Sequence, residues 1–148
     1  MLNNLNKKSA FTLLEIILVF ALIAISAGIV APIYYSAKSN DDFNNSFSTL
    51  VSSLRRAQIL SMASLNDSSW GLKLIDNKII IFKGDSYLNR LVDYDEIVSV
   101  NRNIQSSGLD EVVFSKYTGR PNLSGDILWQ LSSLEKTLNI NELGIVDY

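Results

Sequence analysis

An apolar stretch near the N-terminus constrains the fold of this chain more than any other feature. From Ile16 to Ala31 the only polar side chain is that of Ser26, and the apolar character extends back to Phe11. A helix needs about 20 apolar residues to cross the hydrocarbon layer of a membrane, and this stretch is long enough to do so. Glu15 breaks the pattern, because a carboxylate deep in a bilayer costs about 3 kcal/mol by insertion scales. Glu15 therefore indicates a partner that compensates its charge.

The residues at the start of this stretch resemble the N-terminal signature of type IV pilins and type II secretion pseudopilins. Lys7 and Lys8 make a short basic leader, Ala10 is small, and the segment Phe11-Thr12-Leu13-Leu14-Glu15 opens the apolar helix. One residue differs from the signature, because glycine is usual where Ala10 stands. The resemblance implies that residues 1–10 are a prepilin leader.

The same resemblance implies how the chain is processed and assembled. A prepilin peptidase would cut the bond between Ala10 and Phe11 and methylate the new terminal amine of Phe11. Glu15 would then neutralise the amine of a neighbouring subunit as the helices bundle into a filament, and Pro32 stands where such helices commonly carry a kink. The implied partners are the peptidase, other pilins or pseudopilins, and an inner-membrane assembly platform.

Two simpler interpretations of the stretch are a secretory signal and a plain membrane anchor. A secretory signal has an apolar core of about 7 to 15 residues, whereas this core is longer and contains Glu15. A plain anchor explains the length but leaves Glu15 and the small residue before Phe11 unexplained. The pilin-type interpretation accounts for all of these features.

The charge balance argues against nucleic acid as a general partner. The chain has 148 residues, of which 13 are basic and 15 acidic, and its formal net charge is −2. Removal of residues 1–10 takes away Lys7 and Lys8, which leaves 11 basic and 15 acidic residues and a net charge of −4. Binding to nucleic acid depends on Lys and Arg side chains that neutralise phosphates, so we do not expect the mature protein to bind it.

Two residue types that serve much of enzyme chemistry are missing. The sequence contains no cysteine and no histidine, which excludes disulfides, thiol nucleophiles, imidazole bases and Cys or His metal ligands. We therefore expect a protein that is not an enzyme and that uses no metal and no cofactor.

Charges on either side of the apolar stretch predict its orientation. Lys7 and Lys8 precede it, and Asp41 and Asp42 follow it. Basic residues stay on the cytoplasmic side of a membrane, so we expect a single-pass protein of the cytoplasmic (inner) membrane with its N-terminus in the cytoplasm. The C-terminal domain would then be periplasmic or otherwise extracytoplasmic.

A second pattern continues the helix beyond the apolar stretch. Neither Gly nor Pro interrupts the chain between Ile33 and Leu65, and apolar or small residues recur at three- and four-residue spacing, namely Phe43, Phe47, Leu50, Leu54, Ala57 and Ser61. This periodicity predicts one helix from Phe11 to about Leu65. Residues 11–35 would form its transmembrane or filament-core half, and residues 36–66 an amphipathic half that packs on a sheet.

The remaining residues, 67–148, show the patterns of short strands and turns. Trp70–Ile75 and Lys78–Phe82 flank the polar pair Asp76-Asn77 and predict a hairpin. Further strands are predicted at 97–100, 111–114, 127–131, 137–140 and 145–147, with turns between them that include 124–126 and 132–136. One long helix followed by short strands predicts an α+β fold of the pilin type, in which the helix packs on an antiparallel β-sheet domain.

Three segments also resemble the minor pseudopilin family labelled GspH/FimT. They are Leu54-Arg55-Arg56-Ala57-Gln58 late in the helix, Trp70-Gly71 at the first strand, and the closing pattern Thr137-Leu138-Asn139-Ile140-Asn141 followed by Gly144-Ile145-Val146. The resemblance implies a minor subunit of a secretion or pilus machine.

Two groups of charged residues are candidate binding sites. Arg55 and Arg56 are candidates for an anionic partner, but adjacent helical residues point about 100° apart and commonly form the solvated flank of an amphipathic helix. Asp93, Asp95 and Glu96 are candidates for calcium, although the glycine and the bidentate glutamate of an EF-hand loop are missing. For both groups we favour the solvated-surface interpretation.

Three further residues, Trp70, Trp129 and Arg120, are candidate binding residues. Trp70 and Trp129 each lie in a predicted strand beside aliphatic residues, so we expect them to pack in or beside the core rather than form a binding platform. The run Gly119-Arg120-Pro121 resembles part of a basic DNA-contact element of competence pilins, but no second arginine follows at short range.

The function predicted from these observations is that of a minor pseudopilin or pilin-like structural subunit of a type II secretion system or type IV pilus. One alternative is the DNA-receptor minor pilin of a competence pilus, which would need a basic patch. Another is a membrane-anchored binding domain that forms no filament.

Overall fold

The computed structural model describes residues 11–148, although within its helix the side chains of residues 29–33 and 36 are left out. The predicted leader, with Lys7, Lys8 and Ala10, lies outside the described residues. Contacts within the chain divide it into two units, with the boundary between Ser39 and Asn40.

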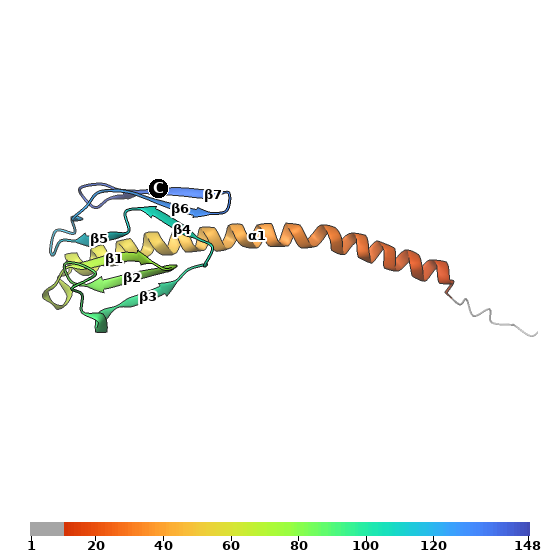
Figure 1. The fold of residues 1–148 in the computed structure, drawn as a ribbon, viewed down its shortest axis with the longest axis horizontal. Helices are drawn as coiled ribbons and strands as arrows, with labels where there is room; N and C mark the ends of the chain where they lie inside the picture. Colours follow the sequence, from red (N-terminus) through yellow and green to blue (C-terminus); the bar gives the residue numbers. More distant parts are fainter. Residues whose placement is uncertain (1–10) are drawn as a thin grey trace, which may run out of the picture. The chain divides into compact units, whose positions relative to one another are not determined.

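A single α-helix, α1 (Leu13–Met62), contributes to both units (Figure 1). The sequence predicts this helix with slightly wider ends. After Met62 the chain leaves the helical conformation at Ser64, which has a left-handed φ of 49°. The backbone is helical at Pro32, and the kink assigned to this residue stays a prediction.

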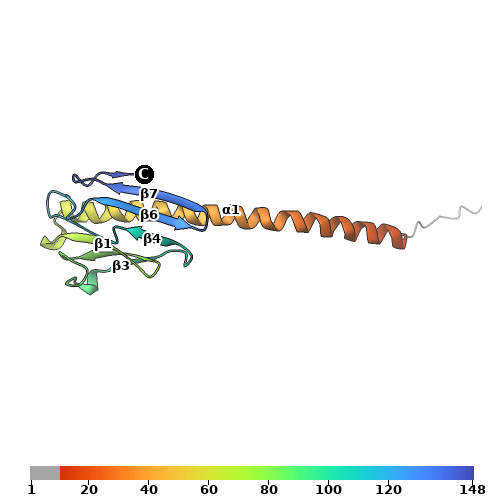
Figure 2. The ribbon, with the colours of Figure 1, turned by 45° about the horizontal axis from the view of Figure 1, so that its top comes forward.

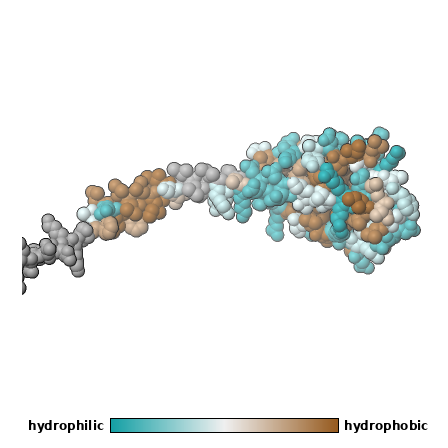
Figure 3. Space-filling view, turned by 180° about the vertical axis from the view of Figure 1, so that it is seen from behind, coloured by the Kyte–Doolittle hydropathy of each residue, from teal (hydrophilic) through white to brown (hydrophobic). Residues whose placement is uncertain are grey.

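The first unit holds the N-terminal part of α1, and the surface of its described residues before residue 29 is mainly apolar (Figure 3). Among its described side chains, nine large aliphatic or phenylalanine side chains are more than half exposed: Phe11, Leu13, Leu14, Ile17, Leu18, Phe20, Leu22, Ile23 and Ile25. Among the residues that the structure describes, no helix is both long and apolar enough to count as a membrane span. The transmembrane assignment of residues 11–35 gains no support from that result and stays a prediction.

The second unit contains two antiparallel sheets (Figures 1 and 2). The first has the order β3-β2-β1-β5, with β1 (Trp70–Ile75), β2 (Lys78–Lys83), β3 (Glu96–Ser99) and β5 (Glu111–Phe114). The second has the order β4-β6-β7-β8, with β4 (Gln105–Gly108), β6 (Gly125–Leu131), β7 (Leu134–Ile140) and β8 (Val146–Asp147). Short 3-10 turns lie at Leu65–Asp67 and Val92–Tyr94. The predicted α+β class with antiparallel strands is confirmed and is compatible with a pilin fold.

The hairpin predicted around Asp76 and Asn77 is present. The strands β1 and β2 pair from Trp70 with Lys83 to Ile75 with Lys78, and the two linking residues have φ angles of 46° and 61°. Two consecutive left-handed residues make the tight turn whose twist matches that of the strands.

Three strands differ from the sequence prediction by more than one residue. One of them is β6, which begins at Gly125 although residues 124–126 were predicted to be a turn, because Gly125 and Asp126 pair with Ile140 and Asn139 of β7. No strand was predicted at β4, because its four residues are polar or glycine and all are exposed, so no alternation of apolar residues marks it.

β7 begins at Leu134. The turn predicted at residues 132–136 is therefore wrong for residues 134–136, which belong to the strand. The chain reverses already at Ser132, with a φ of 56°, and Leu134 pairs with Leu131. The first residues of β7, Glu135 and Lys136, are exposed and polar, so the sequence pattern there resembles that of a loop.

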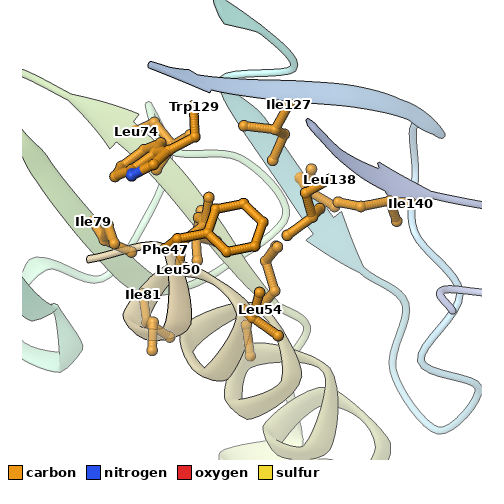
Figure 4. Close-up of a cluster of buried hydrophobic side chains, with 14 of the residues drawn as sticks. Phe47, Leu50, Leu54, Leu74, Ile79, Ile81, Ile127, Trp129, Leu138 and Ile140 are labelled. Carbon is orange, nitrogen blue, oxygen red and sulfur yellow. The ribbon is translucent and has the colours of Figure 1, made fainter. Parts of the chain in front are cut away.

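The core of the second unit lies between the helix and both sheets (Figure 4). All six periodic positions predicted on the helix are buried: Phe43, Phe47, Leu50, Leu54, Ala57 and Ser61. They meet Leu74, Ile79 and Ile81 of the first sheet and Ile127, Trp129, Leu138 and Ile140 of the second. The amphipathic half of the helix thus packs on strands from two sheets, where one sheet domain was predicted.

Gln58 joins the helix to two loops of the second unit. Its side-chain Nε2 donates hydrogen bonds to the carbonyl oxygens of Gly119 and Gly144, each over 3.0 Å. Both glycines have a left-handed φ, of 65° and 79°, and a side chain at Gly144 would collide with the amide of Gln58. The two glycines therefore give the loops both the conformation and the space that these hydrogen bonds need.

Candidate functional site

The candidate site at the start of α1 is organised by Thr12. The backbone N–H of Glu15 donates to the side-chain Oγ1 of Thr12 over 3.3 Å and to its carbonyl over 3.1 Å. The N–H of Ile16 also donates to that carbonyl, over 3.3 Å. These bonds satisfy backbone donors that the first turn of a helix leaves free. No role was predicted for Thr12, although the spacing Thr-x-x-Glu is a sequence signature of a helix start.

Glu15 occupies the third position of the helix, and its residue is exposed. A carboxylate is favoured in the first turn of a helix because the free N–H groups there carry partial positive charge. Thus the local structure already tolerates a negative charge at Glu15. It does not pair that charge, because no ion pair of Glu15 is found among the residues that the structure describes.

The surroundings of Glu15 are apolar. A shallow groove of about 300 Å³ on this part of the helix is lined by Phe11, Glu15, Ile16, Val19 and Phe20. Phe11 is 78% exposed and Phe20 is 67% exposed. Phe11 and Glu15, the two residues predicted to pair between subunits, thus border the same groove. A molecule that docks here would have to offer an apolar surface and one cation.

The two arginines late in the helix have different environments. Arg56 donates from Nε and Nη2 to both carboxylate oxygens of Glu96, over 2.6 and 2.7 Å. These hydrogen bonds and the charge of Arg56 lower the pKa of Glu96, and the same carboxylate raises the pKa of Arg56. The guanidinium of Arg55 lies 5.8 Å from the ring centre of Tyr148 and has no ion-pair partner among the described residues.

Asp93, Asp95 and Glu96 lie just before and at the start of β3, and two of them form ion pairs with arginines. Arg90 donates from Nε to Asp95 over 2.8 Å, and Glu96 is held by Arg56. Only Asp93 of the three carboxylates has no basic partner among the described residues. Within that part of the chain no cluster of three metal-ligating side chains occurs. The paired carboxylates are poor candidates for calcium, which needs several oxygen ligands turned toward one point.

Both tryptophans pack in the core, as predicted. Trp70 is 3% exposed and Trp129 is 2% exposed. The hydroxyl of Ser61 accepts the backbone N–H of Trp70 over 2.7 Å and donates to its carbonyl over 3.1 Å. The indole Nε1 of Trp129 donates to the hydroxyl of Ser46 over 3.2 Å. Two buried serines of the helix thus anchor one tryptophan from each sheet.

Arg120 is exposed and follows the loop glycine Gly119. Its backbone N–H donates to the hydroxyl of Thr118 over 3.4 Å. The side chain has no ion pair among the described residues. The geometry of this loop therefore adds nothing to the DNA-contact interpretation.

Comparison with known proteins identifies the N-terminal part of the chain. A family model described as the prokaryotic N-terminal methylation motif matches residues 5–31. No curated protein and no solved structure matches the chain. The matched segment includes Phe11, Thr12, Glu15 and the apolar stretch that follows. The motif indicates a type IV pilin-like subunit of the kind that a prepilin peptidase processes and that assembles with other pilins.

Proposed function

We propose that this chain is a minor pseudopilin or pilin-like structural subunit of a type II secretion system or type IV pilus, of the GspH/FimT type. The precursor enters the cytoplasmic membrane with its N-terminus in the cytoplasm and its second unit outside. A prepilin peptidase cuts between Ala10 and Phe11 and methylates the amine of Phe11. With sibling subunits and an inner-membrane assembly platform, the mature chain joins a periplasmic filament, and it performs no catalysis.

The observation that carries this proposal is the placement of Glu15. It is a lone carboxylate in the first turn of a helix whose surrounding apolar side chains are exposed. In apolar surroundings such a charge is costly unless a cation meets it in good geometry. Cleavage before Phe11 creates a cation at the end of the same helix. Staggered copies would place the amine of one subunit beside Glu15 of the next.

The rival functions lack a comparable observation. A DNA-receptor pilin needs a basic patch, and the mature chain has a net charge of −4, with 11 basic and 15 acidic residues after residues 1–10 are removed. Duplex DNA should therefore not bind in the micromolar range at physiological salt. A membrane-anchored binding domain without a filament would leave the match to the methylation motif unexplained.

Processing provides the direct test. The full chain is expressed in cells with and without a prepilin peptidase, and the N-terminus of the membrane-bound product is determined by mass spectrometry. We expect N-methylated Phe11 only where the peptidase is present. Cleavage after Ala27, or an intact chain in both strains, would replace the proposal with a signal peptide or a simple anchor.

A second experiment tests the role of Glu15 in assembly. Glu15→Leu should be inserted and cleaved normally but should enter filaments at least about tenfold less, because it leaves the amine of a neighbour unpaired in an apolar place. Leu14→Ala, on the adjacent position, is the matched control and should assemble as the wild type does. Incorporation is measured in sheared filament fractions at equal expression. Normal incorporation of Glu15→Leu would show that the pairing mechanism does not apply.

A further inference from the structure

A guanidinium without an ion-pair partner lies among exposed apolar side chains on one flank of the second unit. Arg55 is exposed on α1, and no ion pair of Arg55 is found in the described part of the chain. Ile59, Ile145 and Tyr148 line the same surface hollows as Arg55 and are 63%, 58% and 64% exposed. Single exposed apolar residues are ordinary on a protein, but a group of them around one charge is typical of an interaction surface.

Two hollows of this surface meet at Arg55 and Ile59, which line both of them. The first has a volume of about 420 Å³ and lies between the helix and Tyr148. The second has a volume of about 330 Å³ and lies between the helix and Ile145 and Val146. Hollows of this size can each receive an apolar side chain of a ligand. The guanidinium between them can bind a carboxylate.

The strand β8 borders this surface and lies at the edge of its sheet. It pairs with β7 through Asp147 with Asn139 and Val146 with Ile140, and no strand of the described chain pairs with its other side. An edge strand leaves backbone N–H and C=O groups unpaired along its free side. Val146 and Tyr148 both line the hollows, whereas the alternate residue Asp147 points to the opposite face. A peptide that pairs with the free side of β8 would therefore extend the sheet over the exposed flank of the helix.

The opposite flank of the helix shows how an edge strand can satisfy an arginine of α1. There β3, the edge strand of the first sheet, supplies Glu96, whose two carboxylate oxygens accept hydrogen bonds from Arg56 over 2.6 and 2.7 Å. Arg55 has no such strand beside it. Its guanidinium lies 5.8 Å from the ring centre of Tyr148, a stacking contact that leaves its N–H groups able to donate to a carboxylate. The surface thus lacks an extended segment with one acidic residue.

We propose that β8 and the two hollows bind an extended peptide segment of another protein, in which a carboxylate lies between two apolar residues in the pattern apolar-x-acidic-x-apolar. The segment pairs with the free side of β8. Side chains at alternate positions of a strand point to the same face, so the carboxylate binds Arg55 while the flanking apolar side chains enter the hollows. This inference goes beyond the proposed function and depends neither on processing nor on filament assembly.

Binding is measured with a fluorescently labelled, acetylated pentapeptide, Val-Thr-Glu-Thr-Val, and the full chain in a non-ionic detergent. Fluorescence anisotropy should show saturable binding. A peptide with glutamine in place of glutamate should bind at least about tenfold more weakly, because it cannot neutralise the guanidinium. Thr-Val-Glu-Val-Thr has the same composition but places its valines on the face opposite to the glutamate, and it should also bind at least about tenfold more weakly. Absence of saturable binding, or equal binding of all three peptides, would overturn the proposal.

Substitution of the arginines tests the charge pairing. Arg55→Gln should weaken binding of the glutamate peptide at least about tenfold and leave that of the glutamine peptide within about twofold, so that the preference disappears. Arg56→Gln is the matched control on the adjacent position and should keep the preference. Arg55→Glu should instead prefer the peptide Val-Thr-Lys-Thr-Val. A preference for glutamate that survives in Arg55→Gln or Arg55→Glu would refute the role of Arg55.

Methylation of the peptide backbone tests the pairing with β8. The N–H groups of alternate residues point to the same side of a strand, so only one of two alternate sets can face β8. One peptide is N-methylated at both threonines, and the other at the glutamate and the last valine. One of them should lose at least about tenfold in affinity, and the other should stay within about threefold of the unmodified peptide. Two peptides that both bind as the unmodified one does would refute strand addition.

A second copy of the chain is the other possible occupant of this surface. The natural sequence contains no cysteine, so Ile145→Cys introduces a single thiol beside the hollows. The proposal predicts that this variant stays monomeric under oxidation in detergent and that its thiol is protected from alkylation at least about threefold by the glutamate peptide. A disulfide dimer that forms without peptide would assign the surface to a second copy and overturn the proposal.

Discussion

The two halves of α1 both carry many apolar side chains, but these side chains are mostly buried in the second half and mostly exposed in the first. In the second unit Leu54 is fully buried, and Leu50 likewise. In the first unit Leu22 is 57% exposed and Phe20 is 67% exposed. The second half is covered by sheets of its own chain, whereas the first half finds no cover among the described residues of the chain.

This difference indicates that apolar residues in the second half of the helix stabilise the folded chain, whereas those in the first half are free to bind other molecules. Burying a leucine stabilises a folded state by about 1.5 to 3 kcal/mol. In the second half of the helix that free energy goes into the stability of the single chain. In the first half that free energy is available only to contacts outside the described part of the chain. If the proposed function holds, substitutions there should act on membrane insertion and assembly rather than on folding.

Removal of the first half should produce the largest effect. A chain that begins at Ser36 keeps the whole second unit and loses the exposed apolar surface. We expect it to be soluble without detergent and to unfold in one cooperative thermal transition, whereas the full chain should need detergent or membranes. Circular dichroism and ultracentrifugation check both properties. A gradual transition would show that residues before Ser36 belong to the folding unit.

Truncation of one leucine in each half should give a smaller but clear contrast. Leu54→Ala creates a cavity in the core and should lower the free energy of unfolding of the second unit by about 2 to 5 kcal/mol. Leu22→Ala is the matched change in the exposed half and should alter it by less than about 0.5 kcal/mol. Urea unfolding of the full chain in detergent, followed by the fluorescence of the buried tryptophans, measures both. Equal losses would contradict the division between the halves.

Substitution of a buried and of an exposed serine in the second half of α1 should also give different losses of stability. Ser61 is fully buried and is bonded to both backbone groups of Trp70. Ser61→Ala removes both hydrogen bonds to the backbone of Trp70 and should cost about 1 to 3 kcal/mol. Ser52→Ala, at an exposed position of the helix, removes only the hydrogen bond to the carbonyl of Thr49 and should be nearly neutral. A neutral result for Ser61→Ala would mean that water replaces the hydroxyl.

The ion pair between Arg56 and Glu96 should contribute least and should depend on pH. The side chains are 56% and 41% exposed, so Glu96→Gln should cost only about 0.5 kcal/mol at pH 7. Because Arg56 lowers the pKa of Glu96 in the folded state, the stabilisation is present above the pKa of the unfolded state and is lost as the pH falls through the lowered value. The difference between wild type and Glu96→Gln should therefore begin to shrink as the pH falls below the ordinary pKa of a glutamate, about 4.3, and should vanish once the pH is below the lowered pKa of the folded state. Glu135→Gln serves as an unpaired control, and a loss that persists in acid would contradict the pairing.

Regular periodicity made the helix and most strands predictable from the sequence. The spacing from Phe43 to Ser61 predicted the buried face of the helix, and the polar pair Asp76 and Asn77 between two β-rich segments predicted the first hairpin. The strand β4 was missed because an edge strand with exposed polar residues carries no apolar pattern. The division into two sheets depends on pairing between distant strands, which local patterns do not encode.

The candidate site was predictable in part. Phe11 and Glu15 were singled out by the motif, and both border one groove. The capping role of Thr12 was available from its spacing to Glu15 but was not used. The different roles of Arg55 and Arg56 could not be predicted, because they depend on Glu96, which is 40 residues away from Arg56 in the chain.

The two serines that hold the tryptophans also bear on the order in which the second unit folds. Ser61 and Trp70 are separated by 9 residues, whereas Ser46 and Trp129 are separated by 83. Closing a short loop costs less chain entropy than closing a long one, and local contacts form faster. We infer that the first sheet docks on the helix before the second. In stopped-flow refolding of the chain that begins at Ser36, the fluorescence of Trp70 in Trp129→Phe should then change earlier than that of Trp129 in Trp70→Phe, and simultaneous changes would refute this order.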